Sequence, residues 1–292
     1  MASAPVINSR HARVVSDHSR QFAEFAFVYP VISRRSGGLS LGVNLNPDKR
    51  CNFDCVYCEV DRRIPGRVQA VAPEQLRGEL TALVRAVKQA HLLREPRFAA
   101  AAELARDIKD IAFSGDGEPT MVPNFAACVE AVAQVRAAEQ LDTTKLVLIT
   151  DAAGLDKADV RRGLEVLDRH NGQVWGKLDA GTEAYYRTVN RSHVSFARIL
   201  RNLQSTARVR PIVIQSLFLR MHGQAMSAPE LEAYCARLND ILRAGGQFKE
   251  IHAYTIARPT PEPWATRLTG PELEGLAQVI RARTGQRVLT FA

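Results

Sequence analysis

The chain is poor in cysteine and has no long apolar run. Five cysteines in 292 residues are too few for a fold held by disulfides, and they indicate a reducing compartment. No stretch approaches the roughly 18 apolar residues that a membrane helix needs. The N-terminal region carries arginine and histidine but lacks the apolar core of a secretory signal. The sequence therefore predicts a cytoplasmic protein that spans no membrane.

Composition sets the size of the core and the charge. The chain is 46% apolar, which suits one large domain or a barrel with extensions. Its net charge is +8, from 32 arginines and 7 lysines against 31 acidic residues. A basic surface attracts polyanions such as RNA, whereas a GC-rich genome raises arginine and alanine by composition alone. The positive net charge is therefore compatible with an RNA partner but does not by itself identify one.

From residue 39 onward, short apolar runs alternate with amphipathic stretches. Strands are predicted at 39–45, 110–113, 145–149, 173–178, 212–219, 250–256 and 287–291, and helices at 73–95, 123–139, 157–170, 194–207, 228–244 and 270–283. This alternation predicts an α/β fold with a parallel sheet and right-handed crossovers. Six such units make a partial (β/α)6 TIM-like barrel at 39–262, with an N-terminal extension at 1–38 and a helix-and-strand extension at 263–292.

Cys51, Cys55 and Cys58 form a C-x3-C-x2-C run that places three thiolates on one short loop. A [4Fe–4S] cluster takes four cysteine ligands, one per iron. Three cysteines therefore leave one iron open, as at a catalytic rather than a structural metal site. Zinc sites show two C-x2-C pairs or cysteines with histidines at finger spacing. Here His18 and His91 lie more than thirty residues away, so a cluster is favoured over zinc.

The cysteine loop resembles that of the radical SAM superfamily. The resemblance implies a partial barrel of the radical SAM type and a cluster whose open iron binds S-adenosylmethionine (SAM). It further implies reductive cleavage of SAM to a 5′-deoxyadenosyl radical that abstracts hydrogen from a substrate. An electron donor such as flavodoxin or ferredoxin would be the partner. Tyr57, before the third cysteine, is implied to pack beside the adenine.

A second segment, Ile-Ala-Phe-Ser-Gly-Asp-Gly-Glu-Pro at 111–119, is a short apolar strand that breaks into a turn. It resembles the Gly-Gly-Glu segment of the same superfamily, with Asp116 in place of the first glycine, flanked by Gly115 and Gly117. The resemblance implies that this turn contacts the SAM amino group. Glycines let the backbone approach a ligand closely, and the Glu118 carboxylate can accept from an ammonium.

Further candidates follow the predicted strands, because active sites of such barrels lie at the carboxyl ends of the strands. Thr150 and Asp151 are expected either to hydrogen-bond a ribose or carboxylate or to cap a strand end. The resemblance implies that Lys177 neutralises the SAM carboxylate and that Asp179 orients it, whereas a lysine at a strand end is otherwise an ordinary surface residue. The cysteine loop, the glycine turn and these residues are expected to share one rim. Catalytic residues toward the substrate are not identified.

Other segments narrow the resemblance. The runs at 33–35, 40–44, 114–120, 177–181 and 254–259 recur in that order in Fe–S oxidoreductases related to the tRNA 4-demethylwyosine synthases, so the likeness covers residues 28–262. Those synthases carry further cysteines upstream for a second cluster, and this chain has none before Cys51. The resemblance implies an oxidoreductase or transferase acting on an RNA base, or alternatively on a peptide or small metabolite. A metal-binding nucleic-acid module is the other alternative.

Four remaining positions have open roles. The polar loop at 190–193, with Asn190, Arg191 and His193, either faces a substrate or is an ordinary loop before a helix. Arg258 follows a predicted strand, and its planar guanidinium suits a phosphate or carboxylate. The two other cysteines, at 128 and 235, lie within helical patterns and are expected to be small buried apolar residues.

Overall fold

The computed structural model describes residues 22–67 and 69–292. The chain divides into two compact units that interleave along the sequence. Among the described residues, the first unit comprises 22–50, 65–67, 69–149 and 157–173, and the second comprises 51–64, 150–156 and 174–292. The cysteine loop therefore folds with the C-terminal half of the chain. Residues 1–21 of the predicted N-terminal extension lie outside the described residues.

The first unit contains four strands in the order β1 (Val28–Ser33), β2 (Gly38–Val43), β3 (Ile108–Phe113) and β4 (Lys145–Thr150). β1 and β2 pair antiparallel, whereas β2, β3 and β4 are parallel. The sequence pattern missed β1, because its residues are nearly all buried and show no alternation. Pro30 also interrupts the run, and a proline is tolerated in a strand that lies at the sheet edge.

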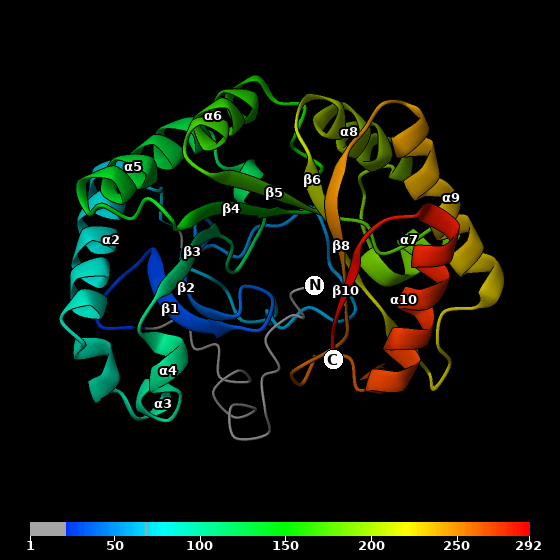
Figure 1. The fold of residues 1–292 in the computed structure, drawn as a ribbon, viewed down its shortest axis with the longest axis horizontal. Coiled ribbons are helices and arrows are strands. Elements are labelled where there is room, and N and C mark those ends of the chain that lie inside the picture. Colours follow the sequence, from blue (N-terminus) through cyan, green and yellow to red (C-terminus); the bar gives the residue numbers. More distant parts are fainter. Residues whose placement is uncertain (1–21, 68) are drawn as a thin grey trace. The chain divides into compact units, whose positions relative to one another are not determined.

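Three long helices of the first unit lie side by side along its strands (Figure 1). They are α2 (Pro73–Lys88), α5 (Phe125–Ala138) and α6 (Ala158–Arg169). In α2, Pro73 occupies the first turn, and Leu76, Leu80 and Leu83 are buried at a spacing of three to four residues, which places them on one face. Short helical turns complete the unit: η2 (His91–Arg94), α3 (Pro96–Ala99), α4 (Ala102–Ala105) and η3 (Pro119–Met121).

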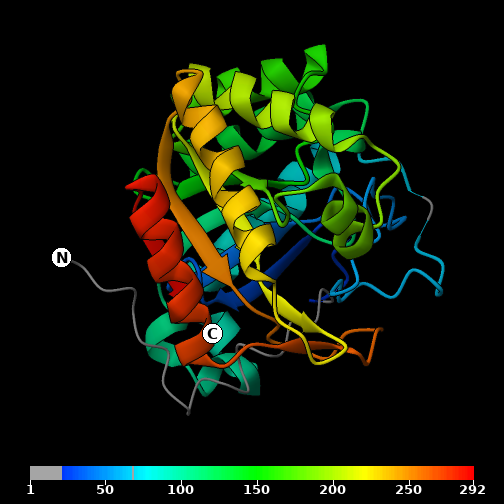
Figure 2. The same ribbon diagram turned by 90° about the vertical axis from the view of Figure 1, so that its right-hand side faces the viewer.

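The second unit has parallel strands in the order β5 (Gly172–Lys177), β6 (Ile212–Leu217), β8 (Phe248–Tyr254) and β10 (Val288–Phe291). The first two residues of β5 belong to the first unit. Its helices are α7 (Glu183–Asn190), α8 (Phe196–Val209), α9 (Ala228–Arg243) and α10 (Gly270–Thr284). α9 and α10 run side by side next to β8 (Figure 2).

The strand predicted at 212–219 is wrong in its extent. β6 ends at Leu217, and a separate short strand β7 (Leu219–Met221) pairs antiparallel with β9 (Ala265–Arg267). The chain changes direction at Phe218, whose backbone amide donates to the carbonyl of Tyr254 at 2.8 Å. The sequence does not show where one strand ends and the next begins, because both strands bury apolar side chains and so read as one continuous apolar run.

Among the described residues, no helix is both long enough and apolar enough to cross a bilayer.

One buried side chain of β6 breaks the rule that buried polar atoms are paired. Gln215 is 0% exposed, and in the described part of the chain neither atom of its amide has a hydrogen-bond partner. The strand register places it between Lys177 of β5 and His252 of β8. Neighbouring residues in register share a sheet face, so three polar side chains form one row. An unpaired buried amide costs free energy of folding.

We expect Gln215→Met to raise the free energy of unfolding by about 1–3 kcal/mol, because it removes the unpaired amide at nearly the same length. Urea unfolding monitored by circular dichroism measures the change. The matched control is Ser216→Ala on the same strand. Ser216 Oγ donates to the Leu178 carbonyl at 2.6 Å and lies 2.7 Å from Tyr234 Oη, so its removal should destabilise. A less stable Gln215→Met variant would contradict the unpaired state of the amide.

Candidate functional site

The cysteine loop is anchored in the second unit by backbone bonds and by apolar packing. The amides of Asp54 and Val56 donate to the carbonyls of Asn190 and Val189, each at 3.0 Å. These bonds attach the loop to the last residues of α7. The side chains of Val56 and Tyr57 are buried in an apolar cluster whose other buried members are Val189, Leu217, Leu219 and Ala265. The loop is therefore a fixed part of this unit.

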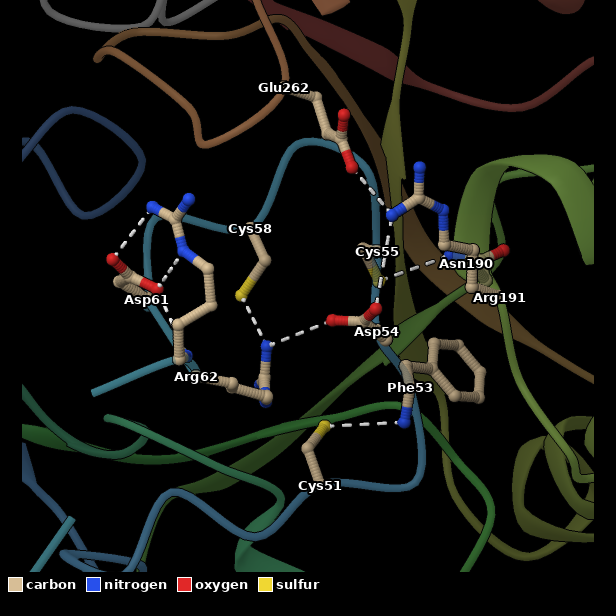
Figure 3. A network of polar contacts seen from close by, with 11 residues as sticks. Cys51, Phe53, Asp54, Cys55, Cys58, Asp61, Arg62, Asn190, Arg191 and Glu262 are labelled. Atoms are coloured by element: carbon tan, nitrogen blue, oxygen red, sulfur yellow. Dashed lines mark hydrogen bonds and ion pairs between the residues drawn. The ribbon is translucent and has the colours of Figure 1, made fainter. Parts of the chain in front are cut away.

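Each of the three sulfurs on the loop accepts a hydrogen bond from an N–H group (Figure 3). The donors are the Phe53 amide to Cys51 at 3.4 Å, Asn190 Nδ2 to Cys55 at 3.4 Å and Arg62 Nη1 to Cys58 at 3.1 Å. A neutral thiol sulfur is only a weak acceptor. Three directed donors therefore suit sulfurs that carry negative charge, as metal-bound thiolates do.

The three thiols of the loop are the donor set that an iron–sulfur cluster would need, because a four-iron cluster takes one thiolate per iron. Among the described residues, no group of three or more His, Cys, Asp or Glu side chains is arranged to hold one metal ion. A cavity of about 500 Å³ beside the loop is lined by Cys55 and Cys58 together with Arg62 and Arg191. Burial raises the pKa of the Cys55 thiol to about 11.

Two of the predicted site residues, Asp179 and Lys177, are connected to the cysteine loop through Tyr57. The buried carboxylate of Asp179 accepts from Tyr57 Oη and, at 2.8 Å, from Asn190 Nδ2 through one oxygen. Its other oxygen accepts from the Leu217 amide at 2.9 Å. Lys177 Nζ donates to Tyr57 Oη at 2.9 Å and lies 4.7 Å from the centre of the tyrosine ring. Tyr57, Lys177 and Asp179 thus form one hydrogen-bonded group.

The charges in this group fix the direction of its hydrogen bonds. Burial by itself lowers the pKa of Lys177, but the charges of Tyr254, Cys55 and Asp179 outweigh burial and raise it. The lysine therefore remains an ammonium. Burial, and then the charge of Asp179, raise the pKa of Tyr57 well above its usual value. Its hydroxyl stays protonated, so it accepts from the lysine and donates to the carboxylate.

The glycine turn after β3 lies in the first unit and is tied to the segment after β2. Asn44 Nδ2 donates to Asp116 Oδ2 at 2.6 Å, and the Asp116 amide donates back to Asn44 Oδ1 at 3.1 Å. A Cβ at Gly117 would lie 2.0 Å from the Arg50 carbonyl oxygen. That carbonyl accepts from the Glu118 amide at 3.0 Å. Only glycine permits this approach at position 117.

Gly115 and Glu118 of the same turn also make close contacts with neighbouring residues. A Cβ at Gly115 would lie 2.5 Å from Asn44 Oδ1. Glu118 is buried, and its Oε1 accepts from the Thr120 amide at 3.1 Å and from the Thr120 hydroxyl at 2.6 Å. This bond caps the short helix η3. The carboxylate is thus positioned by the protein, and its contact with the SAM amino group remains a prediction.

Thr150 and Asp151 make the capping contacts that were one of their two predicted roles. Thr150 Oγ1 accepts from the Ala152 amide at 3.0 Å, and Asp151 Oδ1 accepts from the Ala153 amide at 2.8 Å. These bonds shape the turn after β4, in which Ala152 has a φ of 69°. Their predicted contact with a ribose or carboxylate stays a prediction.

The sequence pattern missed two residues that contact the cysteines. Arg62 follows Cys58 by four residues, and a basic residue this close to a cysteine motif was the available signal. Asn190 was assigned only to a polar loop, yet it ends α7 and contacts both Cys55 and Asp179. Arg258, the proposed phosphate or carboxylate ligand, pairs with the carboxylate of Glu59.

The structure also shows the surroundings of the other positions whose roles the sequence left open. Arg191 pairs with Glu262 at 2.6 Å, and His193 is exposed. Cys128 and Cys235 are buried in α5 and α9, which confirms the expectation that they are small buried residues.

Comparison with known sequences gives distant relatives. No family model matches the chain. A UPF0026 protein of Methanocaldococcus jannaschii is 28% identical over 167 residues, which cover 56% of this chain and 43% of that protein. A UPF0026 protein of Helicobacter pylori strain 26695 is 26% identical over 234 residues, which cover 79% of this chain and 66% of that protein. The chain thus spans between about two fifths and two thirds of the length of these relatives.

Comparison with solved structures identifies the fold. A radical SAM methyltransferase from Sphaerobacter thermophilus matches with a TM-score of 0.61 and 14% identity, covering 90% of this chain and 68% of that one. At this identity the likeness shows the fold alone. The chain has the α/β fold of a radical SAM enzyme, which confirms the predicted fold class and the resemblance to that superfamily at the level of the fold. The narrower likeness to wyosine synthases and the boundaries of the extensions remain predictions.

Proposed function

We propose that this protein is a radical SAM enzyme that holds a [4Fe–4S] cluster through Cys51, Cys55 and Cys58. The observation that carries the proposal is the set of three sulfurs, each with its own N–H donor, on an anchored loop. The radical SAM fold of the chain supports it. When bound, the cluster supplies the electron for reductive cleavage of SAM, and the radical formed from SAM abstracts hydrogen from the substrate.

The residues of the second unit would bind and orient the carboxylate end of SAM. We assign to Lys177 the neutralisation of that carboxylate, because it is partly buried and its raised pKa keeps it an ammonium. Tyr57 and Asp179 hold the lysine in place through the hydroxyl bridge. Tyr57 is also assigned to the adenine, and Thr150 with Asp151 to the ribose or carboxylate.

The resemblance to radical SAM enzymes assigns the glycine turn to the amino group of SAM. Gly115, Asp116 and Gly117 offer a backbone path that a ligand can approach closely. Glu118 offers a carboxylate acceptor that Thr120 holds in a fixed orientation. An ammonium bound to such a carboxylate makes a charge-assisted hydrogen bond.

For the substrate we propose an RNA base, supported by the net charge of +8 and by electrostatic attraction of polyanions. A peptide or a small metabolite is the alternative. The electron would come from a low-potential donor such as flavodoxin or ferredoxin. A metal-binding nucleic-acid module is the further alternative.

Single replacement of Cys51, Cys55 or Cys58 by Ala should prevent a stable four-iron cluster and abolish SAM cleavage. Anaerobic reconstitution, iron and sulfide analysis and a visible absorbance spectrum measure the cluster. Cys128→Ala and Cys235→Ala are the matched controls and should keep full iron content. Loss of iron in either control would refute the three-ligand assignment. A wild-type protein that stays colourless and binds zinc would refute the proposed enzyme.

Glu118→Gln should weaken SAM binding while leaving the iron content unchanged. The variant keeps the size of the side chain but loses the charged acceptor, which is worth about 1.5–3 kcal/mol. That corresponds to a loss on the order of ten- to a hundredfold in affinity. Anaerobic equilibrium dialysis with labelled SAM gives the dissociation constant. The exposed Glu130→Gln serves as control, and equal affinity in both variants would remove the proposed contact.

If RNA is the substrate, binding of total tRNA should weaken steeply with salt, because neutralised phosphates release counterions. A plot of log affinity against log salt should have a slope of about 0.7–0.9 per phosphate contact. Heparin is the control polyanion. SAM cleavage stimulated by one RNA class and not by heparin would support the RNA substrate. No tRNA binding near physiological salt would exclude it.

A further inference from the structure

Arg62 has an unusual environment for a guanidinium. Its side chain is only 24% exposed, and Nη1 donates to the sulfur of Cys58 at 3.1 Å (Figure 3). The carboxylate of Asp54 lies 3.9 Å from the same nitrogen. Arg62 Nε is buried and has no hydrogen-bond partner between residues 22 and 292, residue 68 aside. The sulfur is therefore the principal partner of this cation.

A neutral thiol does not compensate a partly buried guanidinium, because its sulfur is a weak acceptor. The arrangement is thus favourable when the sulfur is negative. Asp54 makes a long ion pair with Arg62 Nη1 at 3.9 Å, and because its side chain is 62% exposed it compensates the cation only weakly.

The three N–H donors to the cysteine sulfurs differ in charge. The Phe53 amide and the Asn190 side chain are neutral and lie 3.4 Å from their sulfurs, whereas Arg62 is cationic and lies closer, at 3.1 Å. Lys177 is a second cation of the unit, but its ammonium donates to Tyr57 Oη. Arg62 is therefore the donor that places a full positive charge directly on a ligand sulfur.

We propose that Arg62 sets the reduction potential of the cluster by holding a positive charge on the Cys58 sulfur. The proposal rests on the proposed function. Hydrogen bonds to the sulfurs and net charge are known determinants of cluster potentials. On reduction, one electron enters from the donor, the charge of the cluster core falls from 2+ to 1+, and no bond is broken. A fixed cation beside a ligand sulfur stabilises the more negative, reduced state and raises the potential.

The test is a redox titration of the reconstituted protein with dithionite, followed by electron paramagnetic resonance of the reduced cluster. Arg62→Gln should make reduction about tenfold less favourable, which is a midpoint about 59 mV lower for a one-electron couple. Arg62→Lys keeps the charge but loses the planar fork, so its midpoint should lie between those of Arg62→Gln and wild type. Iron content is measured in parallel and should stay at the wild-type level.

Arg63→Gln is the matched control. Arg63 neighbours Arg62 in sequence, but its guanidinium pairs with both oxygens of Asp61 and its side chain is 78% exposed. Its replacement removes the same formal charge without touching a sulfur, so the midpoint should not move. An equal shift in Arg62→Gln and Arg63→Gln would show a general charge effect and overturn the specific role of Arg62.

Two other outcomes overturn the proposal. A wild-type midpoint in Arg62→Gln at full iron content shows that the contact does not tune the cluster. Loss of iron in both Arg62→Gln and Arg62→Lys shows that the residue retains the cluster instead of tuning it. Failure of the proposed function looks different, because then the wild-type protein and Arg63→Gln also give no signal from a reduced cluster.

Discussion

The second unit depends on one buried carboxylate. Asp179 accepts from a tyrosine hydroxyl, an asparagine amide and a backbone amide, and these donors come from the cysteine loop, from α7 and from the end of β6. A buried charge without such partners would cost several kcal/mol. With them it joins three segments that are far apart in the sequence, and the position of the cysteines follows from that junction.

The same junction determines the chemistry available beside the loop. The pKa values of Tyr57 and Lys177 are both raised, so the group presents a neutral hydroxyl and an ammonium next to the cysteine loop. Asn190 belongs both to the Asp179 group and to the environment of the sulfurs. A change at Asp179 is therefore expected to reach Cys55 through a single side chain. Arg62 and Asn190 contact different sulfurs.

Sequence patterns predicted the regular elements well where periodicity was clear. The helix predicted at 228–244 is α9 (Ala228–Arg243), and that at 270–283 is α10 (Gly270–Thr284); both begin at a cap followed by proline. β1 was missed because five consecutive residues of the strand are buried, which leaves no alternation. α7 was missed because it is only eight residues long. The division of 212–219 into β6 and β7 depends on the partner strand β9, which no local pattern shows.

The sequence by itself located the candidate site and predicted its chemistry. The spacing of Cys51, Cys55 and Cys58 indicates a three-thiolate loop, because short spacing brings ligands together whatever the rest of the fold. Tertiary structure alone decided what surrounds those sulfurs. Asn190 reaches Cys55 across 135 residues and Tyr57 reaches Asp179 across 122, and such contacts depend on how strands and helices pack. Even the contact of Arg62 with Cys58, four residues away, could not be predicted from the sequence. Only the folded path of the chain shows which of the two adjacent arginines faces the sulfur.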